Sequence, residues 1–380
     1  MKTRAAVLHE MGLPSPYSES KPLKIETLEL NKPNQNEVLI KIGAAGLCHS
    51  DLSVINGSRP RPTPMALGHE AAGEIIEIGD NVTNFEVGDH VVCTFIPNCG
   101  HCLPCSEGRP ALCENGAASN EQGELLDGGI RLHNDEDNMH HHLGVSGFAD
   151  YAVVSQHSIV KVDKDIPFEK VAIFGCAVIT GIGAGIGAVI NTAQVKPGSS
   201  VAVVGLGGIG LNAILGAKLA GAGEIIALDI NPGKFELAKK LGATATFNSG
   251  DDDVVEQVKD YVKGGVEYAF ETAGVVPAME VAYKITKRGG STVTTGLPDP
   301  KHEFSFPQVT LAAEERTIKG SYVGSCVPMR DIPRFIALYK QGRLDIDSLL
   351  TDTLPLDEIN EGFDRLAKGD AARLVVKMNN

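Results

Sequence analysis

The order of hydrophobic and polar positions divides the chain into two regions with different patterns. Up to about residue 175, short alternating runs at 37–42, 70–78 and 89–95 are separated by Gly and Pro, which predicts a β-rich region with many turns. From about residue 195, short apolar runs alternate with segments whose apolar residues recur with a helical period. Strands that alternate with helices are typical of a doubly wound parallel sheet.

From about residue 195, the pattern predicts individual strands and helices. Asn231 is a predicted N-cap with Pro232 at the first helical position. From about residue 325 the pattern changes again, to a helix and a closing strand that we expect to return to the first domain. The predicted strands are 199–205, 224–230, 244–248, 266–274, 289–296 and 373–378, and the predicted helices are 209–220, 233–242, 252–262, 276–286 and 331–342.

Composition and charge narrow the class of protein. A length of 380 residues allows two domains. The formal net charge of −14 disfavours nucleic acid as a partner, because such proteins present basic surfaces. No apolar run reaches the roughly 18–20 residues of a membrane span. The N-terminal segment lacks the apolar core of a secretory signal, so the cytoplasm is the predicted location.

A glycine-rich turn follows the predicted strand 199–205 and opens a helix. The pattern G-x-G-x-x-G permits a tight turn, close approach of a pyrophosphate and close packing of the helix. Asp229 ends the next strand, 22 residues after Gly207, where a carboxylate can hold the ribose of NAD and repel the 2′-phosphate of NADP. The alternative is a plain turn with a solvated Asp229. The predicted cofactor residues of the turn are Gly205, Gly207, Gly208, Ile209 and Gly210.

Four of the eight cysteines lie within fifteen residues. The spacing C-x2-C-x2-C-x7-C is formed by Cys99, Cys102, Cys105 and Cys113. In a reducing compartment such a group indicates metal ligation before disulfides. Four thiolates would fill a tetrahedral zinc site, leave no place for water and make the site structural. Two local disulfides and an iron–sulfur cluster are the alternatives.

A second group of potential ligands is dispersed along the chain. Cys48, His69 and Cys176 each also have a plain interpretation, as buried apolar thiols or a core histidine. A resemblance decides between the two interpretations. The segments GLCHSDL, GHEAAGEI, the four-cysteine lobe, GFADYAVV and GLGGIG occur in the order of the medium-chain zinc alcohol dehydrogenases, and the resemblance covers essentially the whole chain.

This resemblance implies an α/β protein with a GroES-like, β-rich catalytic domain and a doubly wound Rossmann coenzyme domain. The expected catalytic domain comprises residues 1–178 and 325–380, with a structural-zinc lobe at 95–115. The expected NAD-binding domain comprises residues 179–324. Two zinc ions per subunit and NAD are the implied cofactors.

The resemblance also implies roles at the dispersed site. Cys48, His69 and Cys176 are the expected ligands of the catalytic zinc, with the fourth position left for water or substrate. Glu70 is expected to approach the metal during ligand exchange. Asp51 is expected to orient His69. In the implied reaction, zinc binds the alcohol oxygen and lowers its pKa. A hydride then passes from the carbon that carries this oxygen to C4 of the nicotinamide.

Further roles come from the same resemblance. Ser50 is expected to hydrogen-bond the substrate oxygen and to begin proton removal. Much of the family completes this relay with a histidine where this chain has Ser53. The remaining expected cofactor contacts are Lys234 at the adenosine ribose, His49 and Arg373 near the pyrophosphate, and Thr180 at the nicotinamide.

The expected substrate channel is partly apolar and partly polar. Phe95 and Leu143 suit an apolar alcohol, and His142 and Arg59 add polarity. Arg59 could pair with an anionic group, or this loop, which also carries Arg61, could hold both arginines in solvent. The long segment 114–146 resembles the insertion of the dimeric subgroup, which predicts a homodimer.

The predicted function is therefore zinc-dependent, reversible oxidation of a primary or secondary alcohol with hydride transfer to NAD. Within the superfamily, the alternatives are a polyol or an S-(hydroxymethyl)thiol dehydrogenase and a zinc-free reductase. The intact set of Cys48, His69 and Cys176 argues against the reductase. A non-catalytic NAD-binding protein is the remote alternative from another class. The expected partners are a small alcohol or aldehyde, with no nucleic acid and no membrane.

Overall fold

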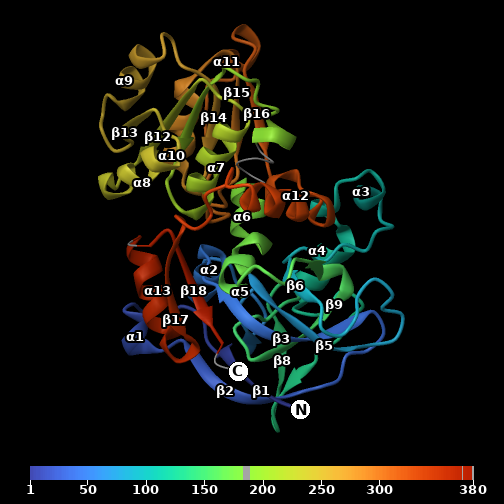
Figure 1. Cartoon of the computed structure of the whole chain (residues 1–380). Coiled ribbons are helices and arrows are strands. Elements are labelled where there is room, and N and C mark those ends of the chain that lie inside the picture. Colours follow the sequence, from blue (N-terminus) through green and yellow to red (C-terminus); the bar gives the residue numbers. More distant parts are fainter. Residues whose placement is uncertain (183–188, 370, 379–380) are drawn as a thin grey trace. The chain divides into compact units, whose positions relative to one another are not determined.

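The computed structural model describes residues 1–182, 189–369 and 371–378 (Figure 1). The chain divides into two compact units, each described here by itself. Unit 1 comprises Met1–Cys176, Val327–Arg334 and Leu350–Asn380, and unit 2 comprises Ala177–Cys326 and Phe335–Leu349. Among the described residues, no helix has both the length and the apolar character that crossing a bilayer requires.

Unit 1 is built from a small closed barrel and a seven-stranded sheet. The predicted runs 37–42, 70–78 and 89–95 become strands β3 (Glu37–Gly46), β5 (Ala71–Ile78) and β6 (His90–Cys93), which pair in antiparallel fashion. The barrel contains β1 (Lys2–Leu8), β2 (Leu23–Leu30), β7 (Leu132–His133), β8 (Asn138–His141) and β4 (Met65–Ala66). The sheet runs β10 (Ile159–Lys161), β6 (His90–Cys93), β5 (Ala71–Ile78), β3 (Glu37–Gly46), β18 (Arg373–Lys377) and β17 (Leu350–Pro355), and β9 (Tyr151–Ser155) also pairs with β3.

The core of unit 1 lies against β3, whose Val38, Ile40 and Ile42 are fully buried at alternate positions. Leu39 on the opposite face is buried in a second cluster with Val7 and Leu28, so both faces of β3 are covered here. Phe148 and Phe363 meet edge to face in the same core. The helices of unit 1 are α1 (Tyr17–Ser20), α2 (His49–Ile55), α3 (Leu103–Ser106), α4 (Glu114–Gln122), α5 (Phe168–Val171) and α13 (Ile359–Lys368).

Unit 2 is a six-stranded, entirely parallel sheet, which confirms the predicted doubly wound coenzyme fold. Val201–Val204 of its strand β11 are buried at every position, as expected where helices cover both faces. The strands run β13 (Ala245–Asn248), β12 (Glu224–Asp229), β11 (Ser200–Val204), β14 (Val266–Glu271), β15 (Thr286–Thr294) and β16 (Thr317–Gly320). The helices are α6 (Ala177–Ile182), α7 (Gly208–Leu219), α8 (Phe235–Leu241), α9 (Val254–Tyr261), α10 (Val276–Ile285) and α11 (Val309–Ala313).

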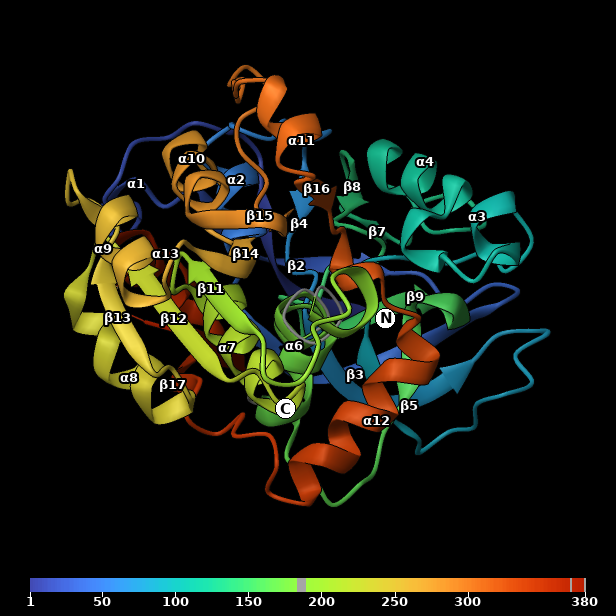
Figure 2. The same cartoon turned by 90° about the horizontal axis from the view of Figure 1, so that it is seen from above.

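The elements around the glycine-rich turn follow the sequence prediction closely. In Figure 2, β11, β12 and β13 lie side by side, with α7 and α8 next to them. The Asn231 side chain accepts a hydrogen bond from the Gly233 N–H, so it caps this turn as predicted. The first turn after Asn231 is a 3₁₀ helix, Pro232–Lys234, and α8 therefore begins later than predicted, at Phe235.

The two units differ from the predicted domains mainly in one segment, and by two residues at each of the boundaries near 177 and 326. Residues 335–349 group with unit 2, whereas the sequence assigns the whole tail after residue 325 to the first domain. The division falls within helix α12 (Pro328–Lys340). Its apolar residues Phe335 and Ile336 are buried. An amphipathic pattern in the sequence predicts that the apolar face of a helix is buried, but it does not predict which unit the helix belongs to.

Candidate functional site

Three potential metal ligands from distant parts of the chain meet in unit 1. Cys48 is the N-cap of α2, His69 lies just before β5, and Cys176 follows a 3₁₀ turn that ends at Gly175. One ligand atom from each of the three lies within 4.8 Å of the other two, and all three side chains are buried. Cysteine sulfur and histidine nitrogen are ligands that zinc prefers, and three of them leave one position open.

The histidine of this group is oriented by a buried carboxylate. Nδ1 of His69 lies 3.0 Å from Oδ1 of Asp51, and neither side chain is exposed. The other ring nitrogen, Nε2, is buried and has no hydrogen-bond partner in the part of the chain that the structure describes. Because buried polar atoms are nearly always satisfied, this free nitrogen fits a metal ion. The Asp51 contact also fixes which nitrogen carries the proton, as second partners of ligand histidines commonly do.

The pKa values of the two thiols in this group are shifted in opposite directions. The hydrogen bond from Cys176, and then His69, holds the pKa of the Cys48 thiol well below its ordinary value despite burial. The same contact with Cys48, together with burial, raises the pKa of Cys176 well above its ordinary value. Two adjacent buried thiolates repel each other, so a divalent cation is what would allow both to ionise.

Glu70 and Arg373 form a buried pair beside this group. Arg373 Nη1 lies 3.5 Å from Oε2 of Glu70 and donates a hydrogen bond to the Leu47 carbonyl at 3.1 Å. A Cβ on Gly46 would lie 2.8 Å from the Glu70 carboxyl carbon, so glycine leaves the space for this side chain. Burial opposes the charge of Arg373, yet Glu70 raises its pKa. The predicted contact of Arg373 with a pyrophosphate stays a prediction, because this side chain is only 4% exposed.

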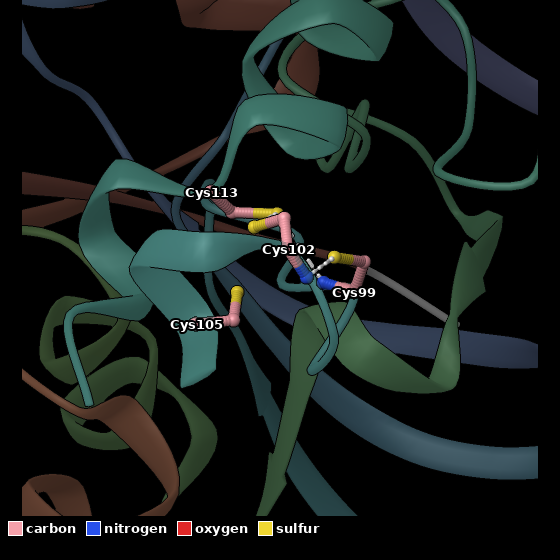
Figure 3. A group of neighbouring side chains, drawn as sticks. All are labelled: Cys99, Cys102, Cys105 and Cys113. Carbon is pink, nitrogen blue, oxygen red and sulfur yellow. Dashed lines mark hydrogen bonds between the residues drawn. The ribbon is translucent and has the colours of Figure 1, made fainter. Parts of the chain in front are cut away.

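The four clustered cysteines surround a small space in their own lobe (Figure 3). Cys102 is the N-cap of α3, and Cys113 is the N-cap of α4. Backbone N–H groups point at the sulfurs: Cys99 N–H and Gly116 N–H donate to Cys113 Sγ, and Cys102 N–H donates to Cys99 Sγ, each at 3.3 Å. None of the eight cysteines forms a disulfide.

The lobe stabilises negative charge unevenly without a cation. Burial raises the pKa of Cys99, but the backbone N–H groups of His101 and Cys102 outweigh it and lower this pKa to about 6. Burial and the neighbouring thiols raise the pKa of Cys105 to about 12. Four soft ligands with preformed N–H donors fit one tetrahedral zinc ion, whose charge offsets the repulsion among the sulfurs.

In unit 2, the glycine-rich turn has a separate reason for each of its three motif glycines. Gly205 has a φ of +99°, and a Cβ there would lie 2.8 Å from Ala273. A Cβ on Gly210 would lie 1.8 Å from the carbonyl oxygen of Gly205. Gly207 meets no atom within 4 Å, so its backbone is open to a phosphate at the start of α7. Gly208 and Ile209 are the first two residues of that helix.

Asp229 is tied to this turn at the end of β12. Its Oδ2 accepts a hydrogen bond from the Leu206 N–H at 2.6 Å, and its Oδ1 accepts one from the Asn231 N–H at 2.8 Å. Lys234 Nζ lies 3.2 Å from Oδ2. The predicted pair of Asp229 and Lys234 is thus formed next to the glycine turn, with the carboxylate held in place by backbone donors.

The other predicted catalytic and cofactor residues are spread over both units. His49 and Ser50 begin α2, with His49 exposed and Ser50 half-buried. The Ser50 N–H donates to Cys48 Sγ at 3.5 Å, which places Ser50 beside the dispersed metal group. Thr180 lies in α6 of unit 2, and its buried hydroxyl has no partner among residues 1–182, 189–369 and 371–378.

Of the predicted channel residues, two are brought to the metal group. The rings of Phe95 and His142 each meet the His69 ring in a T-shaped arrangement, with centroids 5.3 Å apart in both cases. Leu143 follows His142 and is buried. Arg59 is half-buried, and its backbone N–H donates to the Ser53 carbonyl at 2.8 Å.

Sequence reasoning missed two features of this region. Asn120 donates from Nδ2 to the Phe95 carbonyl at 2.9 Å, and Arg61 Nη1 donates to the Asn120 carbonyl at 3.4 Å. His142 also lies against Asp51, with Nδ1 3.1 Å from Oδ1. No local signal in the sequence could have revealed these contacts, because each joins segments far apart in the chain.

Comparison with known proteins gives consistent results over both units. Residues 34–164 match the family model described as alcohol dehydrogenase GroES-like domain, and residues 208–341 match the one described as zinc-binding dehydrogenase. The chain is 40% identical to alcohol dehydrogenase class-3 of Drosophila melanogaster, over 95% of this chain and 96% of that protein. It is 38% identical to the S-(hydroxymethyl)glutathione dehydrogenase of Synechocystis sp., over 99% of this chain and 100% of that protein.

Solved structures show the same similarity in three dimensions. An alcohol dehydrogenase zinc-binding domain protein from Burkholderia ambifaria superposes with a TM-score of 0.93 at 35% identity, covering 100% of both chains. Benzyl alcohol dehydrogenase from Acinetobacter calcoaceticus superposes with a TM-score of 0.91 at 36% identity, covering 100% of this chain and 99% of that one.

Proposed function

The chain belongs to the zinc-dependent medium-chain alcohol dehydrogenase family, and from this membership we propose that it oxidises a primary or secondary alcohol with NAD as the hydride acceptor. The reaction is reversible and yields an aldehyde or a ketone. The observation that carries this proposal is the meeting of Cys48, His69 and Cys176 around an unpartnered histidine nitrogen. Three soft ligands with an open position are what a catalytic zinc needs.

We propose two zinc ions per chain, with different tasks. Cys48, His69 and Cys176 hold the catalytic ion, which supplies a Lewis acid for the oxygen of the alcohol or carbonyl. Glu70 lies fully buried next to His69 and pairs with Arg373, and we expect its carboxylate to approach the ion during ligand exchange. The structural ion belongs to Cys99, Cys102, Cys105 and Cys113, which leave no position for substrate.

Ser50 is the residue that we assign to the first proton transfer. It stands two residues after Cys48 at the N-terminus of α2, where its hydroxyl accepts a hydrogen bond from the alcohol and passes its own proton onward. Ser53 cannot act as an imidazole would, and its Oγ donates to the His49 carbonyl at 2.8 Å. Two routes for the proton follow from Ser53 at this position: through the nicotinamide ribose and solvent, or through another base. Normal turnover in a Ser50→Ala variant would remove Ser50 from both routes.

NAD, rather than NADP, is the coenzyme that the Asp229 carboxylate favours. Asp229→Asn is expected to raise the ratio of kcat/KM with NADP to that with NAD by about tenfold or more, because a 2′-phosphate would no longer meet a buried negative charge. The amide oxygen can accept only one of the two backbone N–H groups that Asp229 binds, those of Leu206 and Asn231, so the affinity of the variant for NAD is measured alongside the ratio. Steady-state kinetics with both coenzymes measure the ratio, and an unchanged ratio refutes the assignment. Asp251→Asn, on an exposed side chain, is the matched control.

Three substrate classes are candidates for the site next to His69. Phe95 and Leu143 suit an apolar alcohol, and the relatives named above include a benzyl alcohol dehydrogenase. The alternative substrate is an S-(hydroxymethyl)thiol, for which a similar enzyme of Synechocystis sp. is named, and a polyol is the third candidate. Arg61 and Asn120 make part of this site polar. The comparison that tests the proposal is kcat/KM for benzyl alcohol, hexanol, sorbitol and the formaldehyde adduct of glutathione. A failure of all four, with NAD bound, would contradict the substrate assignment.

We propose a homodimer in the cytoplasm. The strand β16 forms one edge of the parallel sheet of unit 2, and three of its four residues are exposed. An edge strand with free backbone groups can pair with a second copy of itself. Sedimentation at working concentration tests this state, and a tetramer as the only species would contradict it.

A further inference from the structure

His142 makes a contact that the proposed reaction does not use. Its Nδ1 lies 3.1 Å from Oδ1 of Asp51, the same oxygen that lies 3.0 Å from Nδ1 of His69. The second Asp51 oxygen, Oδ2, accepts the Cys48 N–H at 3.2 Å. One buried carboxylate is therefore shared between two imidazoles and the backbone of a metal-ligand residue.

Contacts of both its backbone and its ring hold His142 in place. Its backbone N–H donates to Ser146 Oγ at 3.0 Å, and that hydroxyl donates to the Ala66 carbonyl at 2.8 Å, three residues before His69. Its ring meets the His69 ring edge to face at 89°. The side chain is only 2% exposed, and the hydroxyl link ties its backbone to the segment that carries His69.

The close approach to Asp51 determines where the His142 proton sits. A nitrogen lone pair at 3.1 Å from a carboxylate oxygen would be repulsive, so Nδ1 carries the hydrogen. This N–H is out of line with Oδ1, and Nδ1 has no aligned hydrogen-bond partner within the described residues. The contact is thus an electrostatic one between side chains that are 2% and 0% exposed, and burial strengthens such contacts.

We propose that His142 is a positioning residue for the catalytic metal: through Asp51 it holds His69 in the orientation that binds the ion. This inference rests on the proposed catalytic site of Cys48, His69 and Cys176. Without the contact of His142, the shared Asp51 oxygen loses one of its two imidazole neighbours, and the His69 ring is less firmly oriented. Partners of this kind commonly change metal affinity by about 10–100-fold.

Three substitutions separate this role from simple filling of space. His142→Phe keeps a ring of similar volume but removes both nitrogens. His142→Asn places an amide nitrogen near the position of Nδ1, and His142→Gln places one near Nε2. Only the asparagine variant retains a donor toward Asp51. If His142 only filled space, metal retention would depend on the volume of the side chain and not on the position of its nitrogen.

The experiment measures release of Co²⁺ from the catalytic site of the full-length protein after addition of a chelator, followed by cobalt absorption. We expect the phenylalanine and glutamine variants to release Co²⁺ about tenfold faster than wild type, and the asparagine variant within about twofold of it. Equal release rates in all four folded proteins would overturn this inference alone. A wild-type protein that takes up no Co²⁺ at this site would overturn the proposed function as well. If the phenylalanine variant does not fold, the asparagine and glutamine pair gives the same comparison.

Discussion

Replacing Cys176 by alanine is expected to remove one zinc ion per chain and to lower kcat/KM for alcohol oxidation by more than about 10³-fold. The reason is that the Lewis acid supplies several kcal/mol of transition-state stabilisation, and each 1.36 kcal/mol is about tenfold in rate. Two remaining ligands, Cys48 and His69, cannot complete the set that the structure brings within 4.8 Å. Metal analysis and initial rates measure the two effects on one preparation.

Cys93 provides a matched control for this substitution. It is also a fully buried cysteine in unit 1, and burial raises the pKa of its thiol to about 12, so it stays a neutral apolar group. Cys93→Ala is expected to retain both zinc ions and nearly all activity. A Cys176→Ala protein that keeps two zinc ions and normal rates would contradict the assignment of the catalytic ligands.

The second large effect is expected in stability rather than in catalysis. Cys105→Ser should release the structural zinc and lower the midpoint of thermal unfolding by about 10 °C, the shift that a loss of about 4 kcal/mol produces in a domain of this size. Between Cys99 and Cys113 the lobe has little apolar material of its own to replace the ion. Leu103 is 67% exposed and Leu112 is 41% exposed, so neither contributes a full core contact.

Two further measurements sharpen this second prediction. Limited proteolysis should cut the variant first between residues 95 and 115, because the loop would lose its cross-link. Ser106→Ala, an exposed change in the same short helix α3, is the control and should leave the unfolding midpoint unchanged. A Cys105→Ser protein with two zinc ions and an unchanged midpoint would rule out a structural ion in this lobe.

Local patterns in the sequence predicted much of the molecule. The buried strand β11, the glycine turn and helix α7 follow directly from apolar spacing and from the close approach at Gly210. The cap at Asn231 was also predictable, because it depends on residues that are neighbours in the chain. The same holds for the four-cysteine lobe, whose ligands all lie in one short loop.

Local sequence patterns could not predict contacts between residues that are far apart in the chain. Only the family resemblance selected Cys48, His69 and Cys176 from eight cysteines and eleven histidines, since no spacing rule joins residues so far apart. The shared Asp51 oxygen and the burial of Arg373 against Glu70 depend on how the strands of unit 1 pack. The assignment of residues 335–349 to unit 2 likewise depends on which surface covers an amphipathic helix.

The most direct test of the central claim is NADH formation from NAD and benzyl alcohol, before and after the labile zinc is stripped and then restored. We expect the rate to fall with the loss of the catalytic ion and to return when Zn²⁺ is added, while Mg²⁺ restores nothing, since sulfur and imidazole ligands select zinc. The same cycle with the formaldehyde adduct of glutathione covers the alternative substrate. Turnover that persists without zinc, or a zinc-loaded protein that binds no NAD, would contradict a zinc-dependent, NAD-linked dehydrogenase.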